Sequence, residues 1–111
     1  FAQEDRETFL IADAEIAADF CLLARGDSMI GARIYDGDAV FIRSQPMVEN
    51  GEIAAVIIDD EATLKRVYYD REHARLQLVP ENPAYSPLVY VGEELDNIRI
   101  LGKAVGFMSI F

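Results

Sequence analysis

The chain has 111 residues, 51% hydrophobic and 27% charged, so it can bury one core and form a single domain over residues 1–111. Ten basic residues stand against 20 acidic ones, and the net charge of −10 argues against direct binding to DNA phosphates, which requires a basic face. The single cysteine excludes an internal disulfide framework and is compatible with a reducing cytoplasm, where we expect the protein. No apolar run approaches the roughly 20 residues of a membrane span, so we expect no membrane partner.

Residues 1–19 form an acidic lead-in. This segment contains one basic residue, Arg6, and six acidic residues: Glu4, Asp5, Glu7, Asp13, Glu15 and Asp19. The apolar group Phe9–Ile11 predicts one short strand, while the alanines leave a helix over Asp13–Phe20 as an alternative. Because the chain begins at Phe1 without an initiator methionine, we expect it to be part of a longer protein.

Beyond residue 19, short apolar runs alternate with turn signals, a pattern typical of a mostly β domain. We expect strands over Phe20–Ala24, Ala39–Arg43, Ile53–Ile58, Thr63–Tyr69, Arg75–Val79, Leu88–Val91 and Ile98–Phe107. The run Ile53–Ile58 is apolar at both alternating sets of positions, which indicates a strand covered on both faces. We expect it to form a hairpin with Thr63–Tyr69. Asn50-Gly51 signals another turn, and Pro80 with Pro83 predicts an irregular loop.

The most informative stretch runs from Leu22 to Met29, where an apolar run stops at Gly26 and Ser28 follows. Glycine allows the backbone to turn sharply, which leaves the serine hydroxyl exposed at a strand end. A serine is a poor nucleophile unless a base takes its proton. The only histidine, His73, lies in a polar turn and is interpreted as a surface residue, so a serine–histidine–aspartate triad has little support.

Lys65 is the other candidate base. Alternation along its strand places Thr63, Lys65 and Val67 on one face, and we expect Arg66 to point to solvent on the other. Burial disfavours the charged form of a lysine, and a pKa lowered from about 10.4 to about 7 or 8 would let it act as a base near neutrality. The alternative is an ordinary strand lysine whose amine reaches the surface, beside an ordinary turn serine.

Other polar candidates have simpler explanations. We expect Asp27 to cap the turn after Gly26, and Cys21 to lie in the core rather than act as a nucleophile. The remaining acids lack calcium-loop spacing and are interpreted as solvated turns: Asp36, Asp38, Asp59, Asp60 and Glu61. We therefore expect no metal and no cofactor.

Several short motifs occur in a characteristic order. They are Gly26–Met29 (Gly-Asp-Ser-Met), Tyr35–Asp38 (Tyr-Asp-Gly-Asp), Thr63–Val67 (Thr-Leu-Lys-Arg-Val), Pro80–Tyr85 (Pro-Glu-Asn-Pro-Ala-Tyr) and Leu101–Gly106. In this order they resemble the LexA/phage CI repressor family of self-cleaving serine–lysine peptidases, over almost the whole chain beyond residue 20. The resemblance implies a compact LexA-like domain of short strands and hairpins, with Ser28 as nucleophile and Lys65 as general base. Backbone N–H groups around Ser28, including its own, are the natural oxyanion donors.

The resemblance also implies a function: the autoproteolytic and dimerising C-terminal domain of a transcriptional repressor, which cuts its own upstream linker. The family cuts a bond between a small residue and glycine, and none of the seven glycines here follows alanine or cysteine, so we expect the scissile bond outside this chain. A RecA filament would act as co-protease, and DNA would be bound only through a half upstream of Phe1. We expect a homodimer through the C-terminal strand, taken as an apolar sheet edge. The alternatives are a UmuD-like polymerase accessory protein and a dimerisation module that does not cleave.

Overall fold

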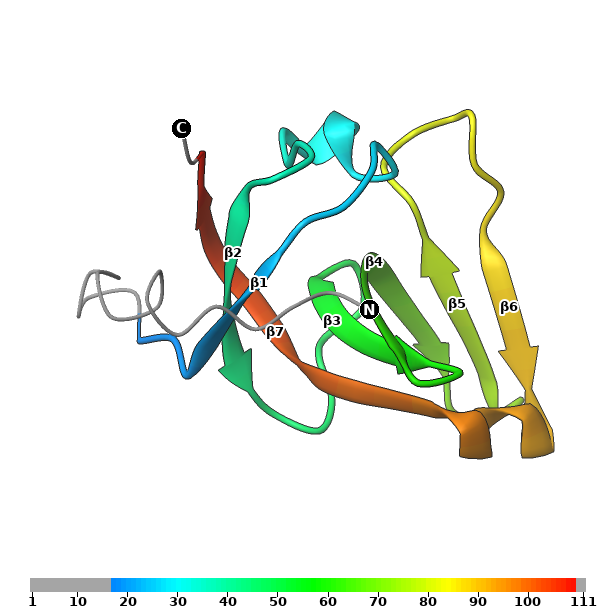
Figure 1. Ribbon diagram of the computed structural model, residues 1–111. Helices are drawn as coiled ribbons and strands as arrows, with labels where there is room; N and C mark the ends of the chain where they lie inside the picture. The colour runs from blue at the N-terminus through cyan, green and yellow to red at the C-terminus, as the bar shows by residue number, and fades with distance from the viewer. Residues whose placement is uncertain (1–16, 110–111) are drawn as a thin grey trace.

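A computed structural model describes residues 17–109, and all structural statements refer to this part of the chain. Its strands are β1 (Phe20–Leu23), β2 (Ala39–Ser44), β3 (Ile53–Ile58), β4 (Glu61–Asp70), β5 (Arg75–Val79), β6 (Leu88–Val91) and β7 (Ile98–Met108), with short 3₁₀ helices η2 (Ile30–Ala32) and η3 (Gly92–Asn97) (Figure 1). The mostly β class is confirmed, and the seven expected strands are present with ends that differ by two residues at most. The strand expected at Phe9–Ile11 lies outside the described residues, as does most of the alternative helix over Asp13–Phe20. Within that range residues 17–19 are not helical, and Phe20 begins β1.

The strands form one antiparallel sheet in the order β1-β2-β7-β3-β4-β5-β6. Strands β3 to β6 follow one another as hairpins, including the expected pairing of β3 with β4. The turn at Asn50-Gly51 joins β2 to β3, which do not pair with each other because β7 lies between them. Figure 1 shows β7 crossing the molecule as its longest strand.

The expectation that the C-terminal strand forms a sheet edge is wrong, since the edges of the sheet are β1 and β6. Strand β7 is interior because it joins the two halves of the sheet. Its first half pairs with β3 up to Lys103, and its second half pairs with β2 from Gly102 to Met108.

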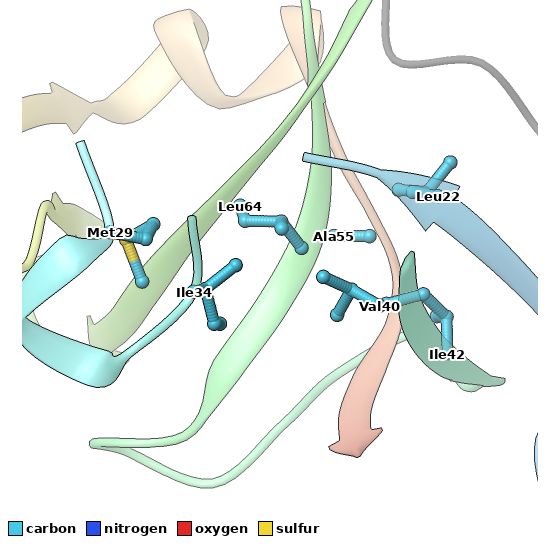
Figure 2. Close-up of a cluster of buried hydrophobic side chains, with 7 residues drawn as sticks. All are labelled: Leu22, Met29, Ile34, Val40, Ile42, Ala55 and Leu64. Atoms are coloured by element: carbon cyan, nitrogen blue, oxygen red, sulfur yellow. The ribbon is translucent and has the colours of Figure 1, made fainter. Parts of the chain in front are cut away.

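Two apolar clusters lie against β3, as its sequence predicts. One contains Ala55 and consists of Leu22, Met29, Ile34, Val40, Ile42, Ala55 and Leu64 (Figure 2). The other contains Ala54 and Val56 and consists of Val48, Ala54, Val56, Val67, Leu76 and Leu78. Alternate residues of β3 thus pack into different clusters, which confirms that this strand is covered on both faces. Cys21 is fully buried, so its assignment to the core is also confirmed.

The first cluster anchors the segment between β1 and β2 onto the sheet. Met29 and Ile34 belong to this segment and pack with Leu64 of β4, as Figure 2 shows. Burial of their side chains holds the intervening chain against β4. Ser28, the residue before Met29, is therefore carried to the strand that contains Lys65.

Candidate active site

The turn that carries Ser28 is held by the Tyr35–Asp38 segment. Gly26 has φ +76°, a left-handed conformation that glycine adopts without the usual steric cost, and its N–H donates to Asp36 Oδ1 at 2.7 Å. The Gly37 N–H donates to the Ala24 carbonyl at 2.8 Å, which closes the two segments on each other. Asp36, rather than the expected Asp27, therefore caps this turn. The prediction for Asp27 failed because the capping segment comes from ten residues further along the chain.

Lys65 reaches this turn from β4. Its Nζ lies 3.4 Å from Ser28 Oγ, 2.9 Å from Thr63 Oγ1 and 3.0 Å from the Leu64 carbonyl oxygen. The residue is only 9% exposed, and no carboxylate within residues 17–109 forms an ion pair with it. Burial without a counter-ion lowers the pKa of Lys65, because the ammonium form loses more hydration than the neutral amine.

Thr63 was missed as a site residue, although the sequence contained a signal for it. Alternation along the strand placed Thr63 on the same face as Lys65, and the structure joins the two by the hydrogen bond to Nζ. The hydroxyl fixes the direction in which the amine points.

The loop over residues 80–86 covers the other side of the Ser28 turn (Figure 1). Asn82 Nδ2 donates to the Asp27 carbonyl at 2.9 Å, and the Tyr85 hydroxyl donates to the Asp27 carboxylate. That carboxylate raises the pKa of Tyr85, mainly because its hydrogen bond, and also because its negative charge, stabilises the protonated phenol. The expected irregular loop is thus present, and it packs on the candidate site.

Arg66 does not point freely to solvent as expected. Its guanidinium forms an ion pair with Glu81, and its Nη1 donates to the Gly51 carbonyl at 2.5 Å. The side chain leaves the strand on the side opposite Lys65, but the loop after β5 returns to meet it.

Ser28 lines two hollows. A cavity of about 200 Å³ on one side is lined by Leu23, Met29, Ile34, Ala62 and Leu64 among others. A second hollow of about 300 Å³ includes Lys65, Tyr85 and Leu88. A polypeptide laid across Ser28 would find side-chain space on both sides of the hydroxyl.

Of the other acids, Asp36 caps the Ser28 turn and Glu61 lines the first cavity. Asp38 is buried and accepts a hydrogen bond from the Tyr35 N–H at 2.8 Å, so the expectation that it is solvated is wrong.

His73 is an exposed residue of the β4–β5 turn, as predicted, with Nδ1 2.6 Å from Asp70 Oδ2. Within residues 17–109, no group of three or more histidine, cysteine, aspartate or glutamate side chains is arranged to hold a metal ion. No helix in this part of the chain is long and apolar enough to cross a membrane.

An antiparallel β domain that brings a turn serine to a buried lysine without a histidine defines a candidate of the serine–lysine hydrolase class. Residues 2–105 match the family described as Peptidase S24-like. The chain belongs to this family.

The curated relatives share a name. The chain is 43% identical over 109 residues to the LexA repressor of Oleidesulfovibrio alaskensis, covering 96% of the chain and 51% of the relative. It is 51% identical over 89 residues to the LexA repressor of Desulforamulus reducens (80% and 38%). It is 42% identical over 107 residues to LexA repressor 1 of Geobacter sulfurreducens (95% and 52%). The chain thus spans about half the length of these relatives, or less.

Proposed function

We propose that this chain is the self-cleaving and dimerising C-terminal domain of a LexA-like transcriptional repressor. The observation that carries the proposal is the buried Lys65 amine, which lies 3.4 Å from the Ser28 hydroxyl and has no carboxylate partner within residues 17–109. The shared name of the relatives favours a repressor over a UmuD-like accessory protein. Burial of a lysine without a counter-ion destabilises the fold. A module that only dimerises would gain nothing in return for this loss of stability.

The contacts of Lys65 suit a neutral amine that accepts a proton. A neutral amine has two N–H donors and one lone pair, and Nζ has three neighbours in hydrogen-bond range. The Leu64 carbonyl can only accept, and the Thr63 hydroxyl accepts the second N–H. The lone pair then faces Ser28, where it can receive the hydroxyl proton.

In the first chemical step, Lys65 takes that proton while Ser28 Oγ attacks the carbonyl carbon of the scissile peptide bond. The carbonyl oxygen gains negative charge and needs N–H donors. The Gly26 N–H is already used by Asp36, whereas the Ser28 N–H donates to no acceptor within residues 17–109. This supports the Ser28 N–H as one oxyanion donor.

In the second step, Lys65 gives its proton to the leaving nitrogen as the C–N bond breaks. Water then attacks the acyl-serine ester, with Lys65 again as base, and releases Ser28. The substrate is a linker upstream of the domain, laid between the two hollows beside Ser28. A RecA filament stimulates the cut, and DNA is bound by the part of the repressor that this chain does not cover.

A fluorophosphonate probe tests the dyad without knowledge of the linker. Ser28 Oγ displaces fluoride from phosphorus, its proton passes to Lys65, and intact-mass spectrometry records the adduct. We expect labelling of Ser28 in the wild-type chain, and none in Ser28→Ala. Lys65→Ala should react about a hundredfold or more slowly. Wild-type labelling rates in Lys65→Ala would overturn the proposal.

Dimerisation through β7 remains part of the proposal, for a different reason than an edge position. Within residues 17–109, Ala104–Met108 pair with β2 on one side and have no strand on the other. A groove of about 360 Å³ follows this open side and includes Ala104–Phe107. A second copy can add the same segment antiparallel across a two-fold axis, which satisfies both strands at once.

Sedimentation of the 12.4 kDa chain at micromolar concentration tests the dimer. We expect a mass near twice that of one chain, and a shift to monomer in Phe107→Ser, whose side chain is 44% exposed. Val89→Ser is the matched control, since Val89 is equally exposed and lies on β6, at the opposite end of the sheet from β1 and β2. A wild-type monomer, or equal effects of both variants, would contradict the role of β7.

A further inference from the structure

The loop after β5 meets the Ser28 turn where the pairing of β4 with β5 ends. The last pair is Arg66 with Val79, so Lys65 has no β5 neighbour. The chain leaves β5 and crosses to the turn instead. There the Glu81 N–H donates to the Ser28 carbonyl at 2.8 Å, and the Gly31 N–H donates to the Glu81 carbonyl at 2.7 Å. The backbone of Glu81 thus forms hydrogen bonds with both ends of the short segment Ser28–Gly31, which carries the serine.

The side chain of Glu81 reaches the strand of the base. Its carboxylate accepts a hydrogen bond from Nε of Arg66, the residue next to Lys65. Arg66 is itself fixed by the Gly51 carbonyl. The two side chains are 32% and 29% exposed, so the ion pair is partly shielded from water. Glu81 is therefore connected to Ser28 through its backbone and to the Lys65 strand through its carboxylate.

The Ser28 turn and the loop after β5 are in close backbone contact at Gly31. A Cβ placed on Gly31 would lie 2.6 Å from the Glu81 carbonyl oxygen, closer than real Cβ atoms approach. The two backbones lie closer together than any residue with a Cβ at position 31 would allow. A displacement of Glu81 is thus passed on to the Ser28 turn.

We propose that Glu81, anchored by Arg66, is a positioning residue that sets the distance between the Ser28 hydroxyl and the Lys65 amine. This inference rests on the proposed function. Glu81 touches neither reacting atom and acts by holding the nucleophile turn at a fixed place relative to β4. Asn82 and Tyr85 also hold the turn through Asp27, so loss of the anchor weakens the alignment without removing it.

The test compares probe labelling of Ser28 in the wild type, Glu81→Ala, Arg66→Ala and the double variant across a pH series. We expect each single variant to lower the plateau rate by about tenfold, the scale of a displacement below 1 Å. The double variant should react as slowly as the single ones, because both changes break one link. The pH midpoint should stay at the wild-type value, because the burial of Lys65 is unchanged.

Lys103→Ala is the matched control, since it breaks an ion pair of similar exposure without touching Glu81, Arg66 or Gly51. It should label at the wild-type rate. A wild-type plateau in Glu81→Ala would overturn the inference. So would a rise of its pH midpoint toward that of an exposed lysine, which would indicate general loosening around Lys65. If Lys65→Ala also labels normally, the proposed function fails; if only Glu81→Ala labels normally, the positioning role alone fails.

Discussion

The two lysines of the chain flank the same residue of the sheet but lie in different surroundings. Ala54 of β3 pairs with Lys65 of β4 on one side and with Lys103 of β7 on the other. Lys103 Nζ lies 2.5 Å from Glu52 Oε2, and both of these side chains are partly exposed. Lys65 is buried, and its neighbours are two hydroxyl groups and a carbonyl.

The different surroundings of the two lysines have opposite electrostatic consequences. The Lys103 ammonium lowers the pKa of Glu52, mainly through their hydrogen bond, so this pair is stable in its charged form. Burial lowers the pKa of Lys65, so this amine is driven toward its neutral form. A carboxylate beside Lys65 would keep it protonated. The lack of such a partner within the described residues therefore supports the proposed role of Lys65 as a base.

The largest expected difference between the two lysines is in the reactivity of Ser28. Lys65→Met should slow probe labelling by about a thousandfold, because the base is lost. Lys103→Met should change it by less than about twofold, since Lys103 contacts neither Ser28 nor Lys65. The measurement is the rate of adduct formation at a pH on the wild-type plateau. Equal rates for the two variants would refute the assignment of the base.

Thr63→Asp should make the surroundings of Lys65 resemble those of Lys103. Thr63 Oγ1 is 2.9 Å from Nζ, so a carboxylate at this position would lie beside the amine and favour its charged form. We expect labelling at pH 7 to fall by at least about tenfold and to recover as the pH is raised. Thr63→Asn, which adds no charge, is the control and should keep the wild-type pH midpoint. An unchanged midpoint in Thr63→Asp would contradict the electrostatic explanation.

A smaller effect is expected on stability. In the unfolded chain Lys65 keeps its proton up to about pH 10.5, whereas the folded protein releases it at a lower pH. Between these two pKa values the unfolded state binds more protons, so the free energy of unfolding of the wild type rises with pH. Lys65→Met removes this penalty. It should be more stable than wild type at pH 7, on the order of 1 kcal/mol, with a difference that shrinks toward pH 10.5.

Denaturant unfolding at several pH values checks this effect, because other titrating groups are common to both proteins and cancel in the difference. A Lys65→Met variant that is less stable than wild type at pH 7 would show that burial of the Lys65 amine does not destabilise the fold.

The smallest effect is expected at the exposed pair. Lys103→Met should lower the free energy of unfolding by a few tenths of a kcal/mol at pH 7, since water screens this ion pair. The pKa of Glu52 is lowered in the folded state, so its contribution is present above its ordinary pKa and is lost as the pH falls through the lowered value. Unfolding of the two proteins at low and neutral pH measures this. If the difference in free energy of unfolding persists in strong acid, it arises from side-chain packing and not from the ion pair.

The strands and the turn at Ser28 could be predicted because their signals are local, whereas the pairing of Ser28 with Lys65 followed from the resemblance carried by the ordered motifs. Alternation identified Ile53–Ile58 as two-sided, and a glycine at the end of an apolar run marked the Ser28 turn. The position of β7 could not be predicted, because strand pairing depends on contacts between distant segments. The same reason explains why the predictions for Asp27 and Arg66 were wrong. Their partners, Tyr85 and Glu81, lie on a loop whose path is set by where β5 stops pairing with β4.

The most direct test of the account is an NMR titration of the two lysine side chains. With ¹³C at Cε, the chain gives two signals, and Lys103→Met assigns them. We predict that the Lys65 signal titrates clearly below the ordinary lysine value of 10.5, and that the labelling rate of Ser28 rises with the same midpoint. If the Lys65 signal titrates near pH 10.5, Lys65 is an ordinary charged lysine and its assignment as a base is contradicted.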